Sequence, residues 1–243
     1  MHQGLRVSVA IPAYNEAATI AAVVEDFRKH PAVDEVVVVD NRSNDATSSI
    51  AKSAGARVVY EEKPGYGNAC RRGFDESAGD IIILTEADGS FRAYDLDKLL
   101  AYIQAAPFVL GTRTTRQMIE QGANMGFFVR WFNVAMAKIL EGLWYYPHEP
   151  RLTDVGCSYR AIRKESWLQI RAGCVKPGPA FSPEMICEAY RQGVRVVEIP
   201  VHYYKRLGGQ SKHSDSFAKL AKTAISMFFT IIRKRIERAS GQS

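Results

Sequence analysis

Short apolar runs alternate with helix-like segments through the first third of the chain, and this alternation constrains the fold more than any other feature. The runs are rich in Val and Ile, and we predict strands at residues 6–11, 35–39, 57–60 and 81–83. The segments between them, about 16–29, 45–54 and 67–78, are predicted helices, with Asn15 as the N-cap of the first. Near-continuous Val and Ile runs are typical of parallel strands covered on both faces. The pattern therefore predicts an α/β fold, a three-layer sandwich around a mostly parallel sheet.

Polar and glycine-containing segments follow all four predicted strands. These segments are residues 12–16, 40–45, 63–68 and 86–89. The carboxyl ends of parallel strands meet at one edge of a sheet, where α/β folds bind their ligands. Each segment alone has a simpler explanation, because Asn and Asp cap helices and Gly forms turns. Together they predict a single cleft at this edge.

Two carboxylates, Glu86 and Asp88, lie directly behind the fourth predicted strand. Residues two apart in an extended chain point the same way, so this pair can share one hard divalent ion such as Mg²⁺ or Mn²⁺. Gly89 leaves room for a ligand to approach the backbone. A solvated strand end or a helix cap would explain the same pair.

Length and composition indicate an ordinary folded protein. With 243 residues, 47% of them hydrophobic, the chain can form one large domain or two small ones. It contains no apolar stretch of the roughly 20 residues that a membrane span needs, and its N-terminus lacks the apolar core of a signal peptide. We therefore expect a cytoplasmic protein. Its four cysteines are widely spaced without a Cys-x-x-Cys pair, which favours reduced packing residues over a zinc site or disulfides.

Positive charge is concentrated near the C-terminus. Residues 202–238 contain nine Lys and Arg against Asp215 and Glu237, a net charge of +7, whereas the whole chain carries +6. Such a segment suits an anionic partner: nucleic acid, a phosphorylated substrate or an anionic membrane. A solvated helix face is the simpler alternative. The segment lacks the regular aromatic residues of a base-stacking surface, so we do not expect nucleic acid as a partner.

The segment 216–232 is apolar but interrupted by Lys219 and Lys222, and it is too short to span a bilayer. As a helix in the membrane interface it would bury one apolar face while its cations meet lipid head groups. The residues expected on that face are Leu220, Ala224, Met227, Phe228 and Ile231. The aromatic segment 125–147 could form a second interfacial element. Alternatively, both segments pack on the core or in a homodimer interface.

Three motifs in order, residues 9–16, 37–45 and 86–89, resemble the signatures of family 2 glycosyltransferases with the GT-A (Rossmann-like) fold. Segments 109–113, 153–160 and 206–212 extend the resemblance to about residues 6–213. The most similar subgroup comprises dolichyl-phosphate mannose synthase-like, or polyprenyl-phosphate, glycosyltransferases. We therefore expect a catalytic domain over 1–215 and a basic amphipathic C-terminal helix and tail over 216–243.

The resemblance implies the roles of individual residues. Glu86 and Asp88 would bind the metal, and Arg206 and Lys212 would embrace the donor diphosphate or the acceptor phosphate. The nucleotide-binding positions would be Pro12, Tyr14, Glu16, Val39, Asp40, Asn41, Ala87 and Arg113. The subgroup usually has Asp-Asp and Asp-x-Asp where this chain has Asp40-Asn41 and Glu86-x-Asp88. Asp88 is therefore the expected direct ligand, and Asn41 leaves the nucleotide open.

The expected chemistry is loss of a nucleoside diphosphate, whose developing charge a divalent ion and the cations Arg206 and Lys212 would stabilise. If the acceptor attacks the anomeric carbon from the face opposite the leaving diphosphate, the configuration of that carbon is inverted. A hydroxyl acceptor needs a general base, for which Asp154 is the candidate. A lipid phosphate is already ionised and needs none. Asp154 would then orient groups or pair with Arg160.

We thus predict a metal-dependent inverting enzyme that moves a hexose from a UDP- or GDP-sugar to polyprenyl phosphate, peripherally bound to the cytosolic face of a membrane. A second hypothesis keeps this donor chemistry with a glycan or small-molecule hydroxyl acceptor. A third is a non-catalytic module that binds nucleotides or nucleic acid.

Overall fold

A central sheet organises the computed structural model, which describes residues 1–123, 126–208 and 217–240. The seven strands in these ranges follow the order β3-β2-β1-β4-β6-β5-β7, and only β6 runs antiparallel to its neighbours, β4 and β5. The strands are β1 Val7–Ala13, β2 Glu35–Asp40, β3 Arg57–Tyr60, β4 Ile81–Leu84, β5 Phe108–Thr112, β6 Arg160–Arg163 and β7 Val196–Pro200. The predicted α/β fold with a mostly parallel sheet is confirmed.

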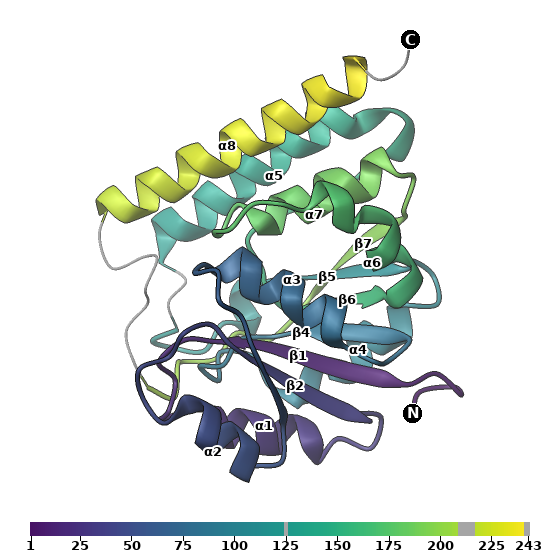
Figure 1. Ribbon diagram of the computed structural model, residues 1–243. Coiled ribbons are helices and arrows are strands. Elements are labelled where there is room, and N and C mark those ends of the chain that lie inside the picture. The colour runs from purple at the N-terminus through teal and green to yellow at the C-terminus, as the bar shows by residue number, and fades with distance from the viewer. Residues whose placement is uncertain (124–125, 209–216, 241–243) are drawn as a thin grey trace.

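Helices cover both faces of this sheet (Figure 1). They are α1 Ile20–Arg28, α2 Thr47–Ser53, α3 Tyr66–Glu76, α4 Leu96–Tyr102, α5 Phe127–His148, α6 Lys164–Ile170, α7 Phe181–Arg191 and α8 Phe217–Ser240. One hydrophobic core lies between the sheet and α1, α2 and α4, and a second lies between the sheet and α3, α6 and α7. Successive residues of β4 enter the two cores in turn, with Ile81 and Ile83 in the first and Ile82 and Leu84 in the second. This explains why the strand reads as an uninterrupted apolar run.

The first helix starts later than the sequence predicts. Its N-cap is Thr19, while Asn15 has a φ of 53° in the left-handed region, which asparagine tolerates better than most residues. Residues 16–19 form a turn in which the N–H groups of Thr19 and Ile20 donate to the carbonyl oxygen of Glu16. The prediction of Asn15 as the cap is therefore wrong, and its side-chain Oδ1 accepts instead from the N–H of Asn44 in the loop that follows β2.

The helices α5 and α8 lie side by side and form an outer layer over α7 (Figure 1). On α8, Met227 and Ile231 are buried, and the ammonium group of Lys234 lies 2.6 Å from the carboxylate of Glu188 on α7. The predicted membrane face of this helix is therefore partly wrong: Met227 and Ile231 pack inward, whereas Phe228 is exposed. The side chain of Leu220 lies outside the described residues.

The aromatic segment 125–147 also divides between core and surface. Trp144 on α5 is fully buried, whereas Trp131 and Tyr145 are about half exposed. None of the described helices is long and apolar enough to cross a bilayer. All four cysteines are buried with free thiols, in keeping with their predicted role as packing residues.

Candidate functional site

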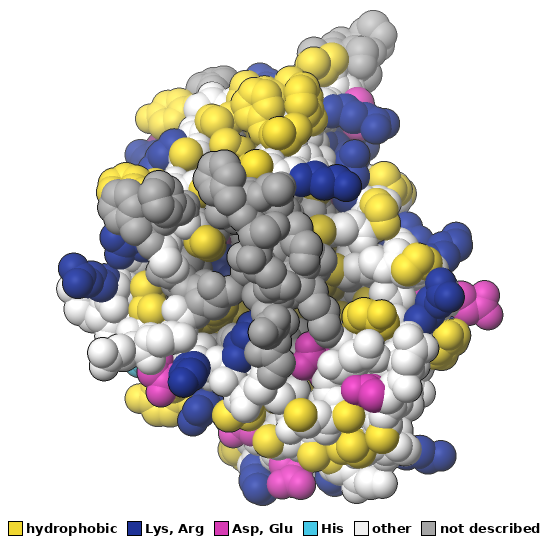
Figure 2. Space-filling model, turned by 90° about the vertical axis from the view of Figure 1, so that its left-hand side faces the viewer, with side chains coloured by type: hydrophobic (Ala, Val, Ile, Leu, Met, Phe, Trp, Pro, Cys, Tyr) yellow, Lys and Arg dark blue, Asp and Glu magenta, His cyan; other side chains and the backbone are white. Residues whose placement is uncertain are grey.

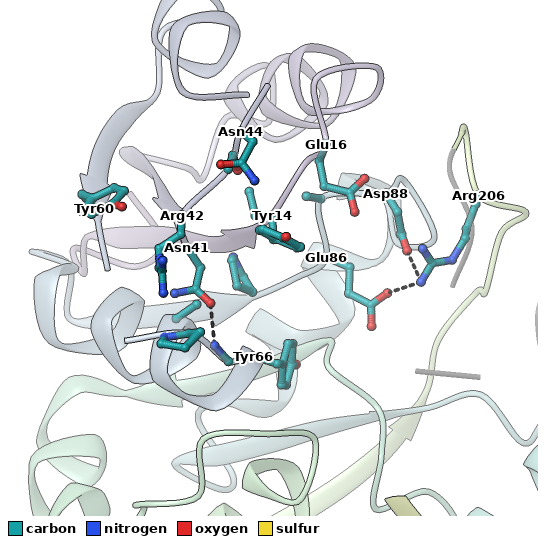
Figure 3. A pocket seen from close by; sticks show the side chains of 17 residues that line it. Tyr14, Glu16, Asn41, Arg42, Asn44, Tyr60, Tyr66, Glu86, Asp88 and Arg206 are labelled. Atoms are coloured by element: carbon teal, nitrogen blue, oxygen red, sulfur yellow. Dashed lines mark hydrogen bonds and ion pairs between the residues drawn. The ribbon is translucent and has the colours of Figure 1, made fainter. Parts of the chain in front are cut away.

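A pocket of about 750 Å³ opens at the carboxyl ends of β1, β2 and β4, at the predicted edge of the sheet (Figure 3). This volume is typical of sites for small molecules and cofactors. Its lining comprises Pro12, Ala13, Tyr14, Glu16, Asn41, Arg42, Ser43, Asn44, Tyr60, Pro64, Gly65, Tyr66, Ala69, Glu86, Ala87, Asp88 and Arg206. All four polar segments singled out in the sequence contribute to this surface.

Hydrogen bonds tie the loop after β1 to the loop after β2. The N–H of Asn15 donates to Ser43 Oγ at 3.0 Å, and the N–H of Asn44 donates to Asn15 Oδ1 at 2.8 Å. The N–H of Glu16 donates to Thr47 Oγ1 at 2.8 Å. These bonds satisfy backbone groups that two isolated loops would leave to water, so they fix the shape of this wall of the pocket.

Asn41 organises the loop that follows β3. Its Nδ2 donates to the carbonyl oxygens of Glu61 and Lys63 at 3.0 and 2.8 Å, and its Oδ1 accepts from the N–H of Gly65 at 2.8 Å. This loop leads to Pro64, Gly65 and Tyr66 at the pocket wall. An aspartate could not donate to the two carbonyls, which gives a structural reason for Asn41 at this position.

Three of the predicted nucleotide-binding residues, Val39, Asp40 and Arg113, do not line the pocket. Val39 is fully buried, and the carboxylate of Asp40 accepts from the N–H of Ser43 at 2.8 Å and from the hydroxyl of Ser48. Asp40 therefore holds the turn that carries Ser43 and Asn44 into the pocket. Lys212 lies outside the described residues.

Glu86, Asp88 and Arg206 meet at one end of the pocket (Figure 3). Arg206 Nη2 lies 2.8 Å from Asp88 Oδ2 and 3.9 Å from Glu86 Oε2. Asp88 Oδ1 accepts from the N–H of Ser90, and Glu86 Oε1 accepts from the hydroxyl of Ser158. Burial, together with the neighbouring carboxylate of Asp88, raises the pKa of Glu86 to about 7. The site is thus a partly desolvated pair of carboxylates that already attracts a cation.

This pair fits a divalent ion that arrives with a phosphate ligand. Within the described ranges no group of three or more His, Cys, Asp or Glu side chains forms a complete metal cage. Mg²⁺ and similar ions are commonly held by one or two protein carboxylates, with phosphate oxygens and water as the other ligands. Glu86 and Asp88 supply that number of hard oxygen donors.

The sequence comparison decides the family. Residues 8–162 match the model of glycosyl transferase family 2. The chain belongs to glycosyltransferase family 2. It is therefore a glycosyltransferase that uses a nucleotide sugar, and the resemblance found in its motifs is confirmed.

Relatives of this family 2 glycosyltransferase cover most of its length. An uncharacterized glycosyltransferase of Mycobacterium tuberculosis is 34% identical over 214 residues, which are 88% of this chain and 92% of that protein. The undecaprenyl-phosphate mannosyltransferase of Micrococcus luteus is 29% identical over 231 residues, covering 86% of this chain and 88% of that protein.

The fold of the glycosyltransferase matches solved structures of GT-A enzymes. Glucosyl-3-phosphoglycerate synthase from Mycobacterium tuberculosis, solved with Mn²⁺, UDP-glucose and phosphoglyceric acid, superposes with a TM-score of 0.75. The sequences are 21% identical, and the match covers 96% of this chain and 80% of that one.

In this glycosyltransferase Arg113 and Asp154 form a buried ion pair. Asp154 Oδ2 accepts from the backbone N–H and Nε of Arg113 at 3.1 and 2.8 Å, and Oδ1 accepts from its Nη2 at 2.9 Å and from the N–H of Gly156 at 3.0 Å. Both carboxylate oxygens are engaged, which does not suit a general base. The arrangement fits the orienting role instead, with a different partner from the one expected: Arg160 donates to the carbonyl oxygens of Val155, Cys157 and Ser182.

Several residues line the pocket of the glycosyltransferase without a role expected from its sequence. Arg42, Tyr60 and Tyr66 all line the pocket, the last two flanking the loop that Asn41 holds. A signal for Tyr66 was present, because it belongs to the glycine-containing segment 63–68 that follows the third predicted strand. Gly65 has a φ of 129°, and a Cβ atom there would lie 2.3 Å from the carbonyl oxygen of Pro177, so only glycine fits.

Proposed function

We propose that this enzyme transfers a hexose, with inversion, from a nucleoside-diphosphate sugar to a polyprenyl phosphate at an anionic membrane surface, using Mg²⁺ or Mn²⁺. The observation that carries the acceptor class is an apolar stripe on the outward face of α8. The donor pocket supports the rest of the proposal.

The proposed donor site is the pocket described above. Pro12, Tyr14, Glu16, Asn41 and Ala87 line the part that would receive the nucleoside, and Val39 and Asp40 support its wall. Glu86 and Asp88 would hold the divalent ion, which when bound would help neutralise the charge of the diphosphate. Arg206 would donate to the departing diphosphate from the same end of the pocket, and Lys212 is proposed to act with it.

The state of Asp154 favours an acceptor that is already ionised. Because Arg113 and the N–H of Gly156 occupy both oxygens of this carboxylate, the candidate base named from the sequence is not free to take a proton. A phosphate oxygen attacks without losing a proton, whereas a hydroxyl group needs a base. Arg113 is proposed to help position phosphate groups from behind the pocket.

The outward stripe of α8 consists of Ile225, Phe228, Phe229, Ile232 and Ile236, of which Ile225, Phe229 and Ile236 are 57%, 64% and 63% exposed. Their spacing of three, four and seven residues places them on one side of the helix, opposite the buried Met227 and Ile231. The cations Lys222, Arg233 and Arg235 flank this stripe in sequence. Figure 2 shows hydrophobic side chains gathered at the top of the molecule, where α8 lies.

This combination is typical of helices that lie in a membrane interface. The division into a catalytic segment 1–215 and a membrane-binding segment 216–243 belongs to the same proposal. The mannosyltransferase of Micrococcus luteus, whose name specifies undecaprenyl phosphate, supports the acceptor class.

A transfer assay tests the reaction. The full chain is incubated with Mn²⁺, radiolabelled UDP-glucose or GDP-mannose, and liposomes with or without undecaprenyl phosphate, and label extracted into organic solvent is counted. We expect lipid-linked label only when metal and lipid phosphate are both present, and NMR of the product should show an inverted anomeric configuration. A parallel incubation contains 3-phosphoglycerate in place of the lipid phosphate, and label transferred to 3-phosphoglycerate but not to the lipid would overturn the acceptor proposal while the donor site would stand.

A flotation assay tests the stripe separately. Phe229→Asp should reduce the fraction of protein bound to anionic liposomes by about tenfold, because it replaces a large apolar contact with a charge. Ser226→Asp adds the same charge to an exposed position beside the stripe and should change binding less than twofold. Equal loss in both variants, or no binding by the unmodified chain, would contradict membrane contact through this face.

A further inference from the structure

Arg206 occupies the position between the two carboxylates where a cation is best stabilised. Its guanidinium contacts Asp88 directly at 2.8 Å and faces Glu86 at 3.9 Å (Figure 3). Both carboxylates also line the pocket, and they are the residues that fit a divalent ion. One cation of the protein itself therefore already offsets part of the negative charge of the proposed metal site.

The segment 203–207, here called the strap, holds Arg206 in this position. The N–H of Tyr204 donates to the carbonyl oxygen of Ser90, and the N–H of Leu207 donates to that of Asp88, both at 2.9 Å. The side chain of Leu207 lies against Gly89, where an added Cβ would come within 2.6 Å of it. The strap thus runs beside the carboxylate segment, and Gly89 makes this close approach possible.

The guanidinium is held but not fully satisfied. Arg206 Nε is buried and has no hydrogen-bond partner among the described residues. A buried donor without a partner costs free energy, so a ligand that accepts from it would be favoured. Diphosphate oxygens entering the pocket would be suitable acceptors for this guanidinium.

We propose that Arg206 selects the metal–nucleotide complex over the bare divalent ion. In the free protein Arg206 stays on Asp88 and weakens the binding of a bare ion, because two cations cannot share these oxygens at full strength. When a nucleoside diphosphate enters, Arg206 shifts to its phosphates and releases the carboxylates. Nucleotide and metal then strengthen each other's binding reciprocally. This inference rests on the metal dependence of the proposed function.

Equilibrium binding of Mn²⁺ tests the proposal without measuring activity. Free Mn²⁺ is quantified by electron paramagnetic resonance with the full chain alone and with saturating UDP or GDP, corrected for the Mn²⁺–nucleotide complex. In Arg206→Gln we expect bare Mn²⁺ to bind about tenfold more tightly than in the unmodified protein, the size expected for loss of a competing charge-assisted hydrogen bond. The strengthening of Mn²⁺ binding by nucleotide should shrink by a similar factor.

Arg42→Gln is the matched control. It removes the same charge from the same pocket, at the end away from the carboxylates (Figure 3). We expect it to change bare Mn²⁺ affinity less than threefold, since only long-range electrostatics are altered. Leu207→Ala, which loosens the strap while keeping the arginine, should also tighten bare Mn²⁺ binding, and thermal melting confirms that each variant is folded.

The outcomes separate this inference from the proposed function. If nucleotide strengthens Mn²⁺ binding equally in Arg206→Gln and the unmodified protein, Arg206 does not compete with the ion for the carboxylates. The metal dependence of the proposed function is then unaffected. If Arg42→Gln tightens bare Mn²⁺ binding as much as Arg206→Gln, the effect is general electrostatics and the proposal is again wrong. If no variant binds Mn²⁺ with or without nucleotide, the metal dependence of the proposed function fails, and the inference fails with it.

Discussion

At the scale of single residues, Asn41 shows how a small departure from a family motif is used. All three of its side-chain hydrogen bonds go to the loop at residues 61–65, so this pocket-lining residue also fixes the position of the neighbouring wall. We therefore expect Asn41 to affect nucleotide binding partly through the position of Pro64, Gly65 and Tyr66.

Asn41→Asp should weaken nucleotide binding and lower stability. The carboxylate would face two carbonyl oxygens that have lost their donor, and we expect the free energy of unfolding to fall by about 2 kcal/mol. Nucleotide affinity, measured by calorimetry with UDP and GDP, should fall by roughly tenfold as the loop shifts. Asn44→Asp puts the same charge into the same pocket without disturbing the loop at 61–65 and should leave stability nearly unchanged. Similar destabilisation in both variants would contradict the role of Asn41.

At the scale of elements, β7 carries a partly buried glutamate, Glu198, to which no role was assigned from the sequence. Glu198 accepts hydrogen bonds from the N–H and hydroxyl of Thr153 and from the N–H of Asp154, and so supports the loop that holds the Arg113 ion pair. Burial nevertheless raises the pKa of Glu198 from 4.5 to about 7, because desolvation outweighs these hydrogen bonds.

The raised pKa predicts a pH-dependent stability. The folded protein binds the Glu198 proton more tightly than the unfolded chain, so this contribution is present below about pH 4.5 and is lost as the pH rises through about 7. Between pH 5 and pH 8 the free energy of unfolding of the unmodified protein, relative to Glu198→Gln, should fall by roughly 2–3 kcal/mol. Urea denaturation at several pH values measures this difference. Glu165→Gln, at an exposed position on α6, serves as the control. If the difference in free energy of unfolding between the unmodified protein and Glu198→Gln stays constant with pH, the prediction is wrong.

Besides its apolar contacts, α8 is joined to α7 by a buried lysine. Lys234 lies 2.6 Å from Glu188 and 3.7 Å from Glu184, and both carboxylates are fully buried. Lys234→Met should lower the free energy of unfolding by about 3 kcal/mol, because it removes the cation that lies beside both buried carboxylates and leaves Glu188 paired with Arg191 alone. Arg233→Met removes a neighbouring exposed cation whose pair with Glu237 is at the surface, and it should cost less than about 1 kcal/mol. Chemical denaturation of the two variants measures these losses. Equal losses in free energy of unfolding would contradict the stabilising role of the buried Lys234.

At the scale of the whole molecule, the order of strands and helices was predictable up to β4, because each strand is a continuous apolar run and each loop ends in polar or glycine residues. The pocket edge followed from that topology. The pairing of Arg113 with Asp154 could not be predicted in this way, because 41 residues separate the two positions and a local periodic pattern does not indicate such a long-range contact. The orientation of α8 was not predictable either, since this helix has apolar residues on two opposite sides and only its packing on α7 decides which side faces inward.

The antiparallel direction of β6 has a consequence for how this enzyme can diversify. Because β6 runs the other way, the chain reaches the ligand edge before entering this strand, so that Ser158 touches Glu86 and Asp154 holds Arg113 from residues that precede it. Residues 12–88 supply the whole pocket lining except Arg206, whereas these later contacts come from a separate stretch of chain. Apart from contacts such as that of Ser158 with Glu86, we expect substitutions in one stretch to disturb the other little. We therefore expect such a lineage to be able to keep one donor while its acceptor changes.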